Sequence, residues 1–221
     1  MATVVTGAQR PLIFVLAGVN GAGNSSVAGA ILEAHGLTWF NPDSYARELL
    51  QQQGWDQGAA NAAAWAFGKE RLEAAIAHGT NFAFETTLGA RTIPRLLREA
   101  SKTHAVIMLF CGLSSVEKHI ERVARRVEHG GHDIPTEKIR ERWLSSRQNL
   151  IELLPHLAEL QLFDNSATAG PGEEIPSPIL LLKLRAGRMV LPAPTDVAAL
   201  MATPDWAKPI VEAALDGTPK P

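Results

Sequence analysis

This sequence has almost no cysteine, and it lacks hydrophobic runs long enough to span a membrane. Cys111 is the only cysteine among 221 residues, which excludes an internal disulfide and is typical of a reducing compartment. It lies in the apolar run 105–113, so a buried structural thiol is predicted. Because no stretch of about 20 apolar residues exists and residues 1–11 lack a signal-peptide pattern, we expect a cytoplasmic protein with no membrane partner.

The sequence also lacks a surplus of positive charge. It has 21 basic and 23 acidic residues, a formal net charge of −2. Binding to a phosphate backbone usually needs a basic surplus, so nucleic acid is not expected as the main partner. With 46% apolar and 20% charged residues, the length suits a single α/β domain. We expect one domain over 1–221, with a core at about 12–166 and a C-terminal extension at about 175–216.

Apolar runs alternate with segments of helical spacing along the chain. This order predicts a mostly parallel sheet of about five strands, with helices on both faces. Ser114 and Glu117 form a capping-box pattern at the start of one helix. The predicted strands are 12–17, 37–40, 82–84, 104–113 and 160–164. The predicted helices are 25–35, 44–53, 57–77, 92–102, 114–128 and 136–154, followed by a hairpin (179–184, 189–191) and short helices at 196–201 and 206–215.

A glycine-rich loop over 18–25 follows the first strand. Its pattern, G-x-x-x-x-G-N-S, differs at one position from the phosphate-binding G-x-x-x-x-G-K-[ST]. Glycines let successive backbone N–H groups point at a phosphate, and the next helix adds its positive N-terminal end. The spacing does not fit the dinucleotide fingerprint. The predicted nucleotide-binding residues are Gly18, Asn20, Gly21, Ala22, Gly23, Asn24, Ser25 and Ser26, with the Ser25 hydroxyl also predicted to bind Mg²⁺.

Asn24 stands where the motif has lysine. That lysine contacts the β- and γ-phosphates of a nucleotide during phosphoryl transfer, whereas asparagine carries no charge. Losing such a contact costs on the order of 10²–10⁴ in rate. We therefore expect nucleotide binding to survive on backbone N–H groups and Mg²⁺, and fast phosphoryl transfer to be lost.

Polar residues follow two further predicted strands, at the strand ends that face the same crevice as the loop. Asp43 is predicted either to accept the proton of an attacking hydroxyl or to cap the helix that begins near Ser44. Glu85, Thr86 and Thr87 are predicted either to hold a sugar or ribose or to cap the next helix.

Two groups of arginines are candidate anion contacts. Arg122, Arg125 and Arg126 crowd one stretch of a predicted helix, where like charges repel unless an anion binds there. The alternative is a solvated face, compensated by the pair of Glu121 with Arg125. The second group, on the next predicted helix, consists of the candidate substrate clamps Arg140, Arg142 and Arg147. The alternative is that these arginines pair with Glu137 and Glu141.

Two further polar segments have weaker signals. His129 and His132 flank two glycines, which favours a flexible lid loop over a metal site, because zinc normally needs three or four ligands. The residues Asp164, Asn165 and Ser166 are predicted either to contact an adenine or to make a turn.

From about Leu12 to Ser166 the chain resembles the zeta-toxin family of P-loop kinases, especially its short stand-alone bacterial members. Together the matching motifs are more specific than the phosphate loop alone. The motifs are 18–25, F-N-P-D (40–43), F-A-F-E-T-T-L (82–88), R-V-A-R-R-V (122–127), G-G-H-D-I-P (130–135), N-L (149–150) and F-D-N-S (163–166).

This resemblance implies ATP- or GTP-dependent phosphorylation of a UDP-activated amino sugar such as UDP-N-acetylglucosamine, and often restraint by a small antitoxin protein. It implies that Asp43 is the base, that Glu85 and Thr86 bind the sugar nucleotide, and that Arg122, Arg125 or Arg126 act on phosphates. Arg91 and Arg140 are further predicted substrate contacts.

Asn24 departs from the family pattern, and two explanations stay open. The first is that the change is deliberate or selected, because an active toxin kills its expression host. The second is that the chain is a natural nucleotide-binding protein that has lost catalysis. The alternatives to the sugar-nucleotide kinase are therefore a catalytically silent nucleotide-binding module that acts through a protein partner, and a kinase for another small hydroxyl acceptor.

Overall fold

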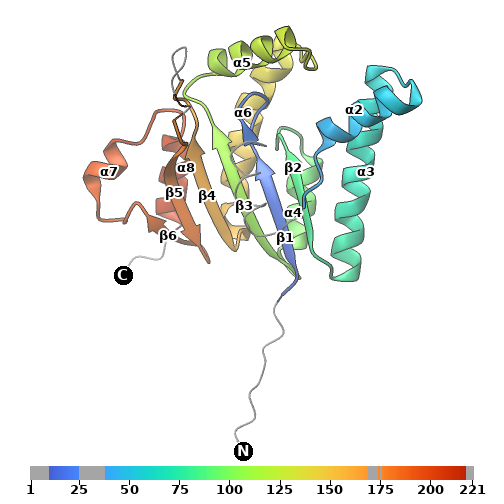
Figure 1. The fold of residues 1–221 in the computed structure, drawn as a ribbon. Helices are drawn as coiled ribbons and strands as arrows, with labels where there is room; N and C mark the ends of the chain where they lie inside the picture. Colours follow the sequence, from blue (N-terminus) through green and yellow to red (C-terminus); the bar gives the residue numbers. More distant parts are fainter. Residues whose placement is uncertain (1–9, 25–37, 169–173, 175, 218–221) are drawn as a thin grey trace, which may run out of the picture.

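One sheet of six strands forms the centre of the fold (Figure 1). The computed structural model describes residues 10–24, 38–168, 174 and 176–217. The strand order is β2-β1-β3-β4-β5-β6, in which the first four run parallel and the last two antiparallel. The strands are β1 (Leu12–Ala17), β2 (Phe82–Thr86), β3 (Ala105–Gly112), β4 (Glu159–Asp164), β5 (Ile179–Arg185) and β6 (Arg188–Leu191). The predicted α/β class with a mostly parallel sheet is confirmed.

Helices pack beside the sheet and above the carboxyl ends of its strands (Figure 1). Helices α4, α6 and α8 pack on one face, where α6 contacts both of the others. Helix α5 lies above the strand ends. The helices are α2 (Pro42–Gln53), α3 (Gln57–His78), α4 (Thr92–Ala100), α5 (Val116–Glu128), α6 (Thr136–Leu153) with the 3₁₀ turn η1 (Leu154–His156), α7 (Val197–Met201) and α8 (Lys208–Asp216).

Strand β1 has apolar side chains on both faces, as expected for a central parallel strand. Ile13, Val15 and Ala17 are fully buried in the main core with residues of α4, α6 and α8. Leu16 points the other way and packs with Leu109 of β3 in a smaller cluster. The glycine loop follows directly after this buried strand, at the carboxyl end of the parallel strands. No helix among the described residues has the length and apolar content needed to cross a membrane.

The structure corrects several predicted boundaries. Of the described part of predicted strand 37–40, only Phe40 pairs, through an isolated bridge to Phe84. The reason is that Asn41 already caps α2, accepting from the Ser44 N–H at 3.1 Å, with Pro42 at the first helical position. Helix 25–35 lies outside the described residues.

The start of α5 and the C-terminal strands also differ from prediction. The cap of α5 is Ser115, which accepts from the Lys118 N–H at 3.3 Å, whereas the Ser114 N–H donates to the Ser166 hydroxyl at 2.7 Å. Strands β5 and β6 form a hairpin as expected, but β5 pairs with β4, so the hairpin extends the main sheet to six strands.

We expect the Cys111 thiol to resist alkylation in the folded protein. Burial, and then the nearby charge of Glu85, raises the pKa of Cys111 to about 12, so the nucleophilic thiolate is scarce at neutral pH. Labelling with iodoacetamide at pH 8 should be slow for the native chain and fast in denaturant. Rapid stoichiometric labelling of the native chain would show that the thiol is accessible and not structural.

Candidate functional site

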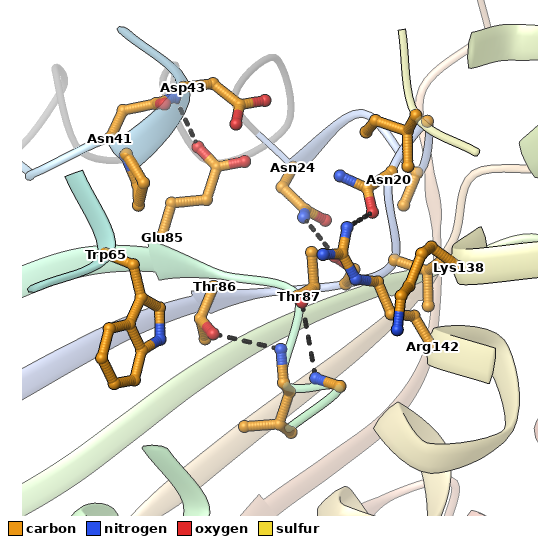
Figure 2. A pocket seen from close by; sticks show the side chains of 18 of the residues that line it. Asn20, Asn24, Asn41, Asp43, Trp65, Glu85, Thr86, Thr87, Lys138 and Arg142 are labelled. Carbon is orange, nitrogen blue, oxygen red and sulfur yellow. Dashed lines mark hydrogen bonds between the residues drawn. The ribbon is translucent and has the colours of Figure 1, made fainter. Parts of the chain in front are cut away.

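A cavity of about 800 Å³ opens at the carboxyl ends of β1 and β2, within the size range of small-molecule sites. The glycine loop forms one wall, and segments of α2, α3, α5 and α6 form the others. Figure 2 shows Asp43, Asn41 and Glu85 on one side of this cavity and Lys138 and Arg142 on the other. The crevice position predicted for the loop, Asp43 and Glu85 is therefore what the fold produces.

The glycine loop has backbone conformations and close contacts that leave no room for side chains at its glycines. Gly21 and Gly23 have φ values of 82° and 85°, in the region that favours glycine. A Cβ on Gly18 would lie 2.4 Å from the carbonyl oxygen of Cys111. The loop is pinned to β2, because the Gly18 N–H donates to the Thr86 carbonyl at 3.2 Å. This close-packed curl fits a phosphate-binding loop.

Asn24 turns its side chain back onto the loop. Its Nδ2 donates to the Gly18 carbonyl at 2.9 Å, and the residue is only 8% exposed. Its Oδ1 is buried and has no hydrogen-bond partner among the described residues, an arrangement that costs free energy. Asn24 therefore closes the loop on itself and brings no charge to the cavity. Ser25 and Ser26, predicted to bind nucleotide and Mg²⁺, lie outside the described residues.

Two side chains from distant segments hold the loop from outside. Asn165, directly after β4, donates from Nδ2 to the Ala22 carbonyl at 2.8 Å. His119 of α5 is buried, and its Nδ1–H donates to the Asn20 carbonyl at 2.9 Å. The alternatives for Asn165 were an adenine contact or a turn. The structure shows a contact with the phosphate loop, which local sequence patterns do not reveal.

We expect His119 to make stability depend on pH. Burial lowers the pKa of His119 from 6.5 to about 4, so between these values the unfolded chain binds the proton more tightly than the folded chain. The free energy of unfolding should therefore fall as pH drops from about 6.5 towards 4, with a slope approaching about 1.4 kcal/mol per pH unit from this group.

Urea unfolding of the native chain and of His119→Gln at pH 7, 6 and 5 would measure this contribution. Glutamine retains a hydrogen-bond donor but does not titrate, so the difference in stability between the two proteins should shrink or reverse with acid. A difference that stays constant with pH would contradict a buried neutral His119.

The carboxylates at the other end of the cavity do not cap helices. Asn41 donates from Nδ2 to Glu85 Oε2 at 2.8 Å, while its own Oδ1 caps α2. Asp43 lies in the first turn of α2, about half exposed, with Oδ2 at 3.7 Å from Arg126 Nη1. The alternative in which Asp43 caps a helix starting near Ser44 is wrong, and the Asp43 carboxylate faces the cavity (Figure 2).

Glu85 and Thr86 belong to β2, and Thr87 follows it. The Thr86 hydroxyl accepts from the Leu88 N–H at 3.1 Å, and the Thr87 hydroxyl accepts from the Gly89 N–H at 3.5 Å. These bonds shape the turn after β2, and α4 begins later without a side-chain cap. The predicted capping of α4 by these residues is therefore wrong, and all three line the cavity.

The three arginines of α5 separate into two groups. Arg122 and Arg126 line the cavity. Arg122 donates to the carbonyls of Asn165 and Ala167 at 2.7 and 3.0 Å, and Arg126 donates to the His132 carbonyl at 2.8 Å. Arg125 instead pairs with Glu121 and is not among the described residues lining the cavity. For Arg125 the solvated-face alternative describes the structure.

On α6 the cavity residues are Lys138, Glu141 and Arg142, and Lys138 Nζ pairs with Glu141 Oε2 at 2.8 Å. Arg142 Nη1 donates to Asn20 Oδ1 at 2.8 Å, which brings a guanidinium to the glycine loop (Figure 2). Arg140 turns away and pairs with Glu117 at 3.2 Å.

Two other arginines predicted to contact substrate, Arg147 and Arg91, lie outside the cavity lining. Arg147 stacks on Trp143, with Cζ 3.5 Å from the ring centroid, and donates to the Trp206 carbonyl at 3.3 Å. Arg91 precedes α4. Neither residue is among the described residues lining the cavity.

The second half of the loop 130–135 lines the cavity, from His132 to Pro135, whereas His129 donates from Nδ1 to the Arg125 carbonyl at 2.7 Å. Among the residues that the structure describes, no three His, Cys, Asp or Glu side chains gather in a set that could hold a metal ion.

A mostly parallel sheet, a glycine loop after its central strand and a polar crevice at the strand ends define an α/β domain with the P-loop kinase-like fold. An AAA domain family model (AAA_33) matches residues 13–151. The chain therefore belongs to this AAA domain family. Among curated protein sequences, none matches the chain significantly.

Solved structures share this fold at low sequence identity. The complex AvrRxo1-ORF1:-ORF2 with ATP superposes with a TM-score of 0.60 at 16% identity, covering 96% of this chain and 78% of that chain. The same complex with sulphate ions gives 0.58 at 17% identity, covering 97% and 78%. The PezAT toxin-antitoxin system of Streptococcus pneumoniae gives 0.52 at 16% identity, covering 77% and 75%.

Proposed function

We propose that this chain is a phosphotransferase of zeta-toxin type, which uses ATP or GTP to phosphorylate a hydroxyl of a UDP-activated amino sugar such as UDP-N-acetylglucosamine. One observation carries the proposal: a single cavity joins a phosphate loop and cationic side chains at one end to Asp43 and Glu85 at the other. Donor and acceptor sites of a kinase must adjoin in this way for in-line transfer.

The end of the cavity formed by the glycine loop, here called the donor end, fits a nucleoside triphosphate. The loop 18–24 offers backbone N–H groups, and Arg122, Arg126 and Arg142 line the same space, so phosphate charge would be balanced by arginine, which suits anion binding. Because Arg125 pairs with Glu121 outside this lining, we assign the phosphate contacts to the other two arginines of α5. Bound Mg²⁺ would neutralise charge on the transferring phosphoryl group, and the Ser25 hydroxyl is its proposed protein ligand.

The acceptor end fits a hydroxyl-bearing substrate. We assign Asp43 as the base that accepts the proton of the attacking hydroxyl. Its carboxylate lies 3.7 Å from Nη1 of Arg126, a residue that also lines the cavity. Glu85, held by Asn41 at 2.8 Å, and Thr86 are the proposed contacts to the sugar. By analogy with the proteins named in the AvrRxo1 and PezAT structures, a small protein partner is also proposed.

Slow transfer in the native chain allows a direct test by equilibrium binding. We expect calorimetry to detect one Mg²⁺–ATP per chain, and then one UDP-N-acetylglucosamine bound by the ATP-loaded protein. The two ligands occupy different halves of the cavity, so they should not compete. Failure to bind nucleotide, or competition between the two ligands for one site, would contradict the proposal.

A second function is favoured by the geometry of Asn24. Its bond to the Gly18 carbonyl at 2.9 Å closes the loop without a charge, which suits a catalytically silent nucleotide-binding module acting through a protein partner. Such a module would bind ATP but would show no turnover with any acceptor, either in the native chain or in Asn24→Lys. Turnover by the variant would exclude it.

A further inference from the structure

One face of α3 forms a wall of the cavity. The residues that contribute to it follow helical spacing: Asn61, Ala64, Trp65, Gly68 and Lys69. Ala64 and Gly68 are buried, and a Cβ on Gly68 would lie only 2.7 Å from the ring of Phe40. The small residues Ala64 and Gly68 therefore leave room in the cavity, and Trp65 is the one aromatic side chain next to them on this face of α3.

Trp65 is 48% exposed, although a tryptophan contributes most to stability when buried. The neighbouring rings of Phe40, Tyr45 and Phe67 contact one another. No contact between Trp65 and another ring is found among the described residues. For comparison, Trp206 is 4% exposed and packs in the main core. Trp65 therefore lines the cavity with about half of its surface uncovered by the rest of the protein.

The position of Trp65 assigns it to the acceptor. In Figure 2 its indole lies on the side of Glu85 and Thr86, opposite Lys138 and Arg142. The nucleotide phosphates of the proposed function belong at the loop and the arginines, so a ring beside Trp65 would belong to the molecule that receives the phosphoryl group. Lys69 of the same face pairs with Glu73 at 2.8 Å, which weakens charge as a means of recognition there.

We propose that Trp65 is a stacking platform that selects acceptors carrying a planar aromatic ring, such as a nucleobase, over bare sugars and alcohols. This proposal rests on the proposed function in one respect, namely that the cavity binds a phosphoryl acceptor. It adds a ring-binding role for a residue that lies in none of the sequence motifs. Stacking on an aromatic side chain makes a base bind more tightly, by about 5- to 100-fold relative to the same site without the ring, and every base can stack in this way.

The kinetic test uses Trp65→Leu and Trp65→Phe in the Asn24→Lys background, with UDP-N-acetylglucosamine and N-acetylglucosamine as acceptors. Trp65→Leu should raise KM for the UDP-sugar by about 5- to 100-fold, with kcat and the KM for ATP nearly unchanged. Trp65→Phe should recover most of the loss. The matched control is Trp55→Leu, since Trp55 is 41% exposed but does not line the cavity. An unchanged KM for the UDP-sugar, or a raised KM for ATP instead, would overturn the proposal.

A binding test separates this proposal from the proposed function. UDP-N-acetylglucosamine and UDP added to the native chain should quench tryptophan fluorescence, N-acetylglucosamine should not, and Trp65→Leu should abolish the quenching while Trp55→Leu preserves it. Quenching that depends on Trp65, together with no phosphoryl transfer by Asn24→Lys to any UDP-sugar, would support the platform and refute the kinase. Quenching that persists in Trp65→Leu, or no binding of either ring-bearing probe, would overturn the platform.

Discussion

Replacing Asn24 with lysine is expected to raise the rate of phosphoryl transfer by on the order of 10²–10⁴. The glycine loop before Asn24 already has its curled backbone, and the Asn24 side chain donates a hydrogen bond to the Gly18 carbonyl at 2.9 Å. A lysine at this position carries the charge that the β- and γ-phosphates require in the transition state. The measurement is the initial rate of ADP formation with UDP-N-acetylglucosamine present, for the variant and the native chain.

The control for this prediction is Asn24→Met, which has a long side chain but no charge. Loss of the bond to Gly18 is common to both variants, so only the charge separates them. We expect Asn24→Met to stay at the native rate or below it. Equal activation by methionine and lysine would show that the Asn24 contact with Gly18, and not a missing charge, limits the rate.

Removing the carboxylate of Asp43 is expected to lower kcat by on the order of 10²–10⁴ in the active Asn24→Lys background. Asp43→Asn keeps the size of the side chain but cannot accept a proton from the acceptor hydroxyl. Since the Asp43 carboxylate pairs with Arg126 and not with a described residue of the phosphate loop, ATP affinity should change only a few-fold. Rates and binding constants measured on the same protein would separate these effects.

Asp205→Asn is a matched control, because Asp205 is exposed and pairs with Lys208 at 2.6 Å, away from the cavity. It should retain full activity. If Asp43→Asn were as active as Asp205→Asn, another group would have to be the base. A loss of ATP binding equal to the loss of rate would instead mean that Asp43 acts on the nucleotide.

Much of the site followed from the sequence because parallel strands end at one edge of the sheet. The loop after β1 and Glu85 at the end of β2 had to meet there, since β1 and β2 are paired with Leu16 opposite Glu85. Asp43 reached the same crevice although its predicted strand shrank to a bridge at Phe40, because the chain still passes beside β2 before α2 begins.

The arginines of α5 show what helical spacing can and cannot predict. His119 and Val123 are the buried residues of α5, and Arg122 and Arg126 share their side of the helix. Arg125 lies about 200° around the helix from Val123, so the apolar stripe could have indicated that it turns away. On α6 no such local signal chose Lys138 and Arg142 over Arg140, because that choice depends on how the packed helix is rotated about its axis.

Long-range contacts were beyond local patterns. Asn165 follows β4 yet bonds to Ala22 of the loop at 2.8 Å, a contact that exists only once β4 takes its place beside β3. The same holds for the C-terminal hairpin, whose pairing with β4 depends on which edge of the sheet is open. Trp65 gave no sequence signal either, because its exposure results from the small residues and Phe40 around it.

If one missing charge separates this chain from a working sugar-nucleotide kinase, ³¹P NMR of Asn24→Lys with Mg²⁺–ATP and UDP-N-acetylglucosamine should reveal the product. We expect a new phosphomonoester resonance that grows in a one-to-one ratio with ADP, and far less of it from the native chain. ATP bound by Asn24→Lys with no phosphomonoester formed would contradict this expectation and leave the silent nucleotide-binding module as the function.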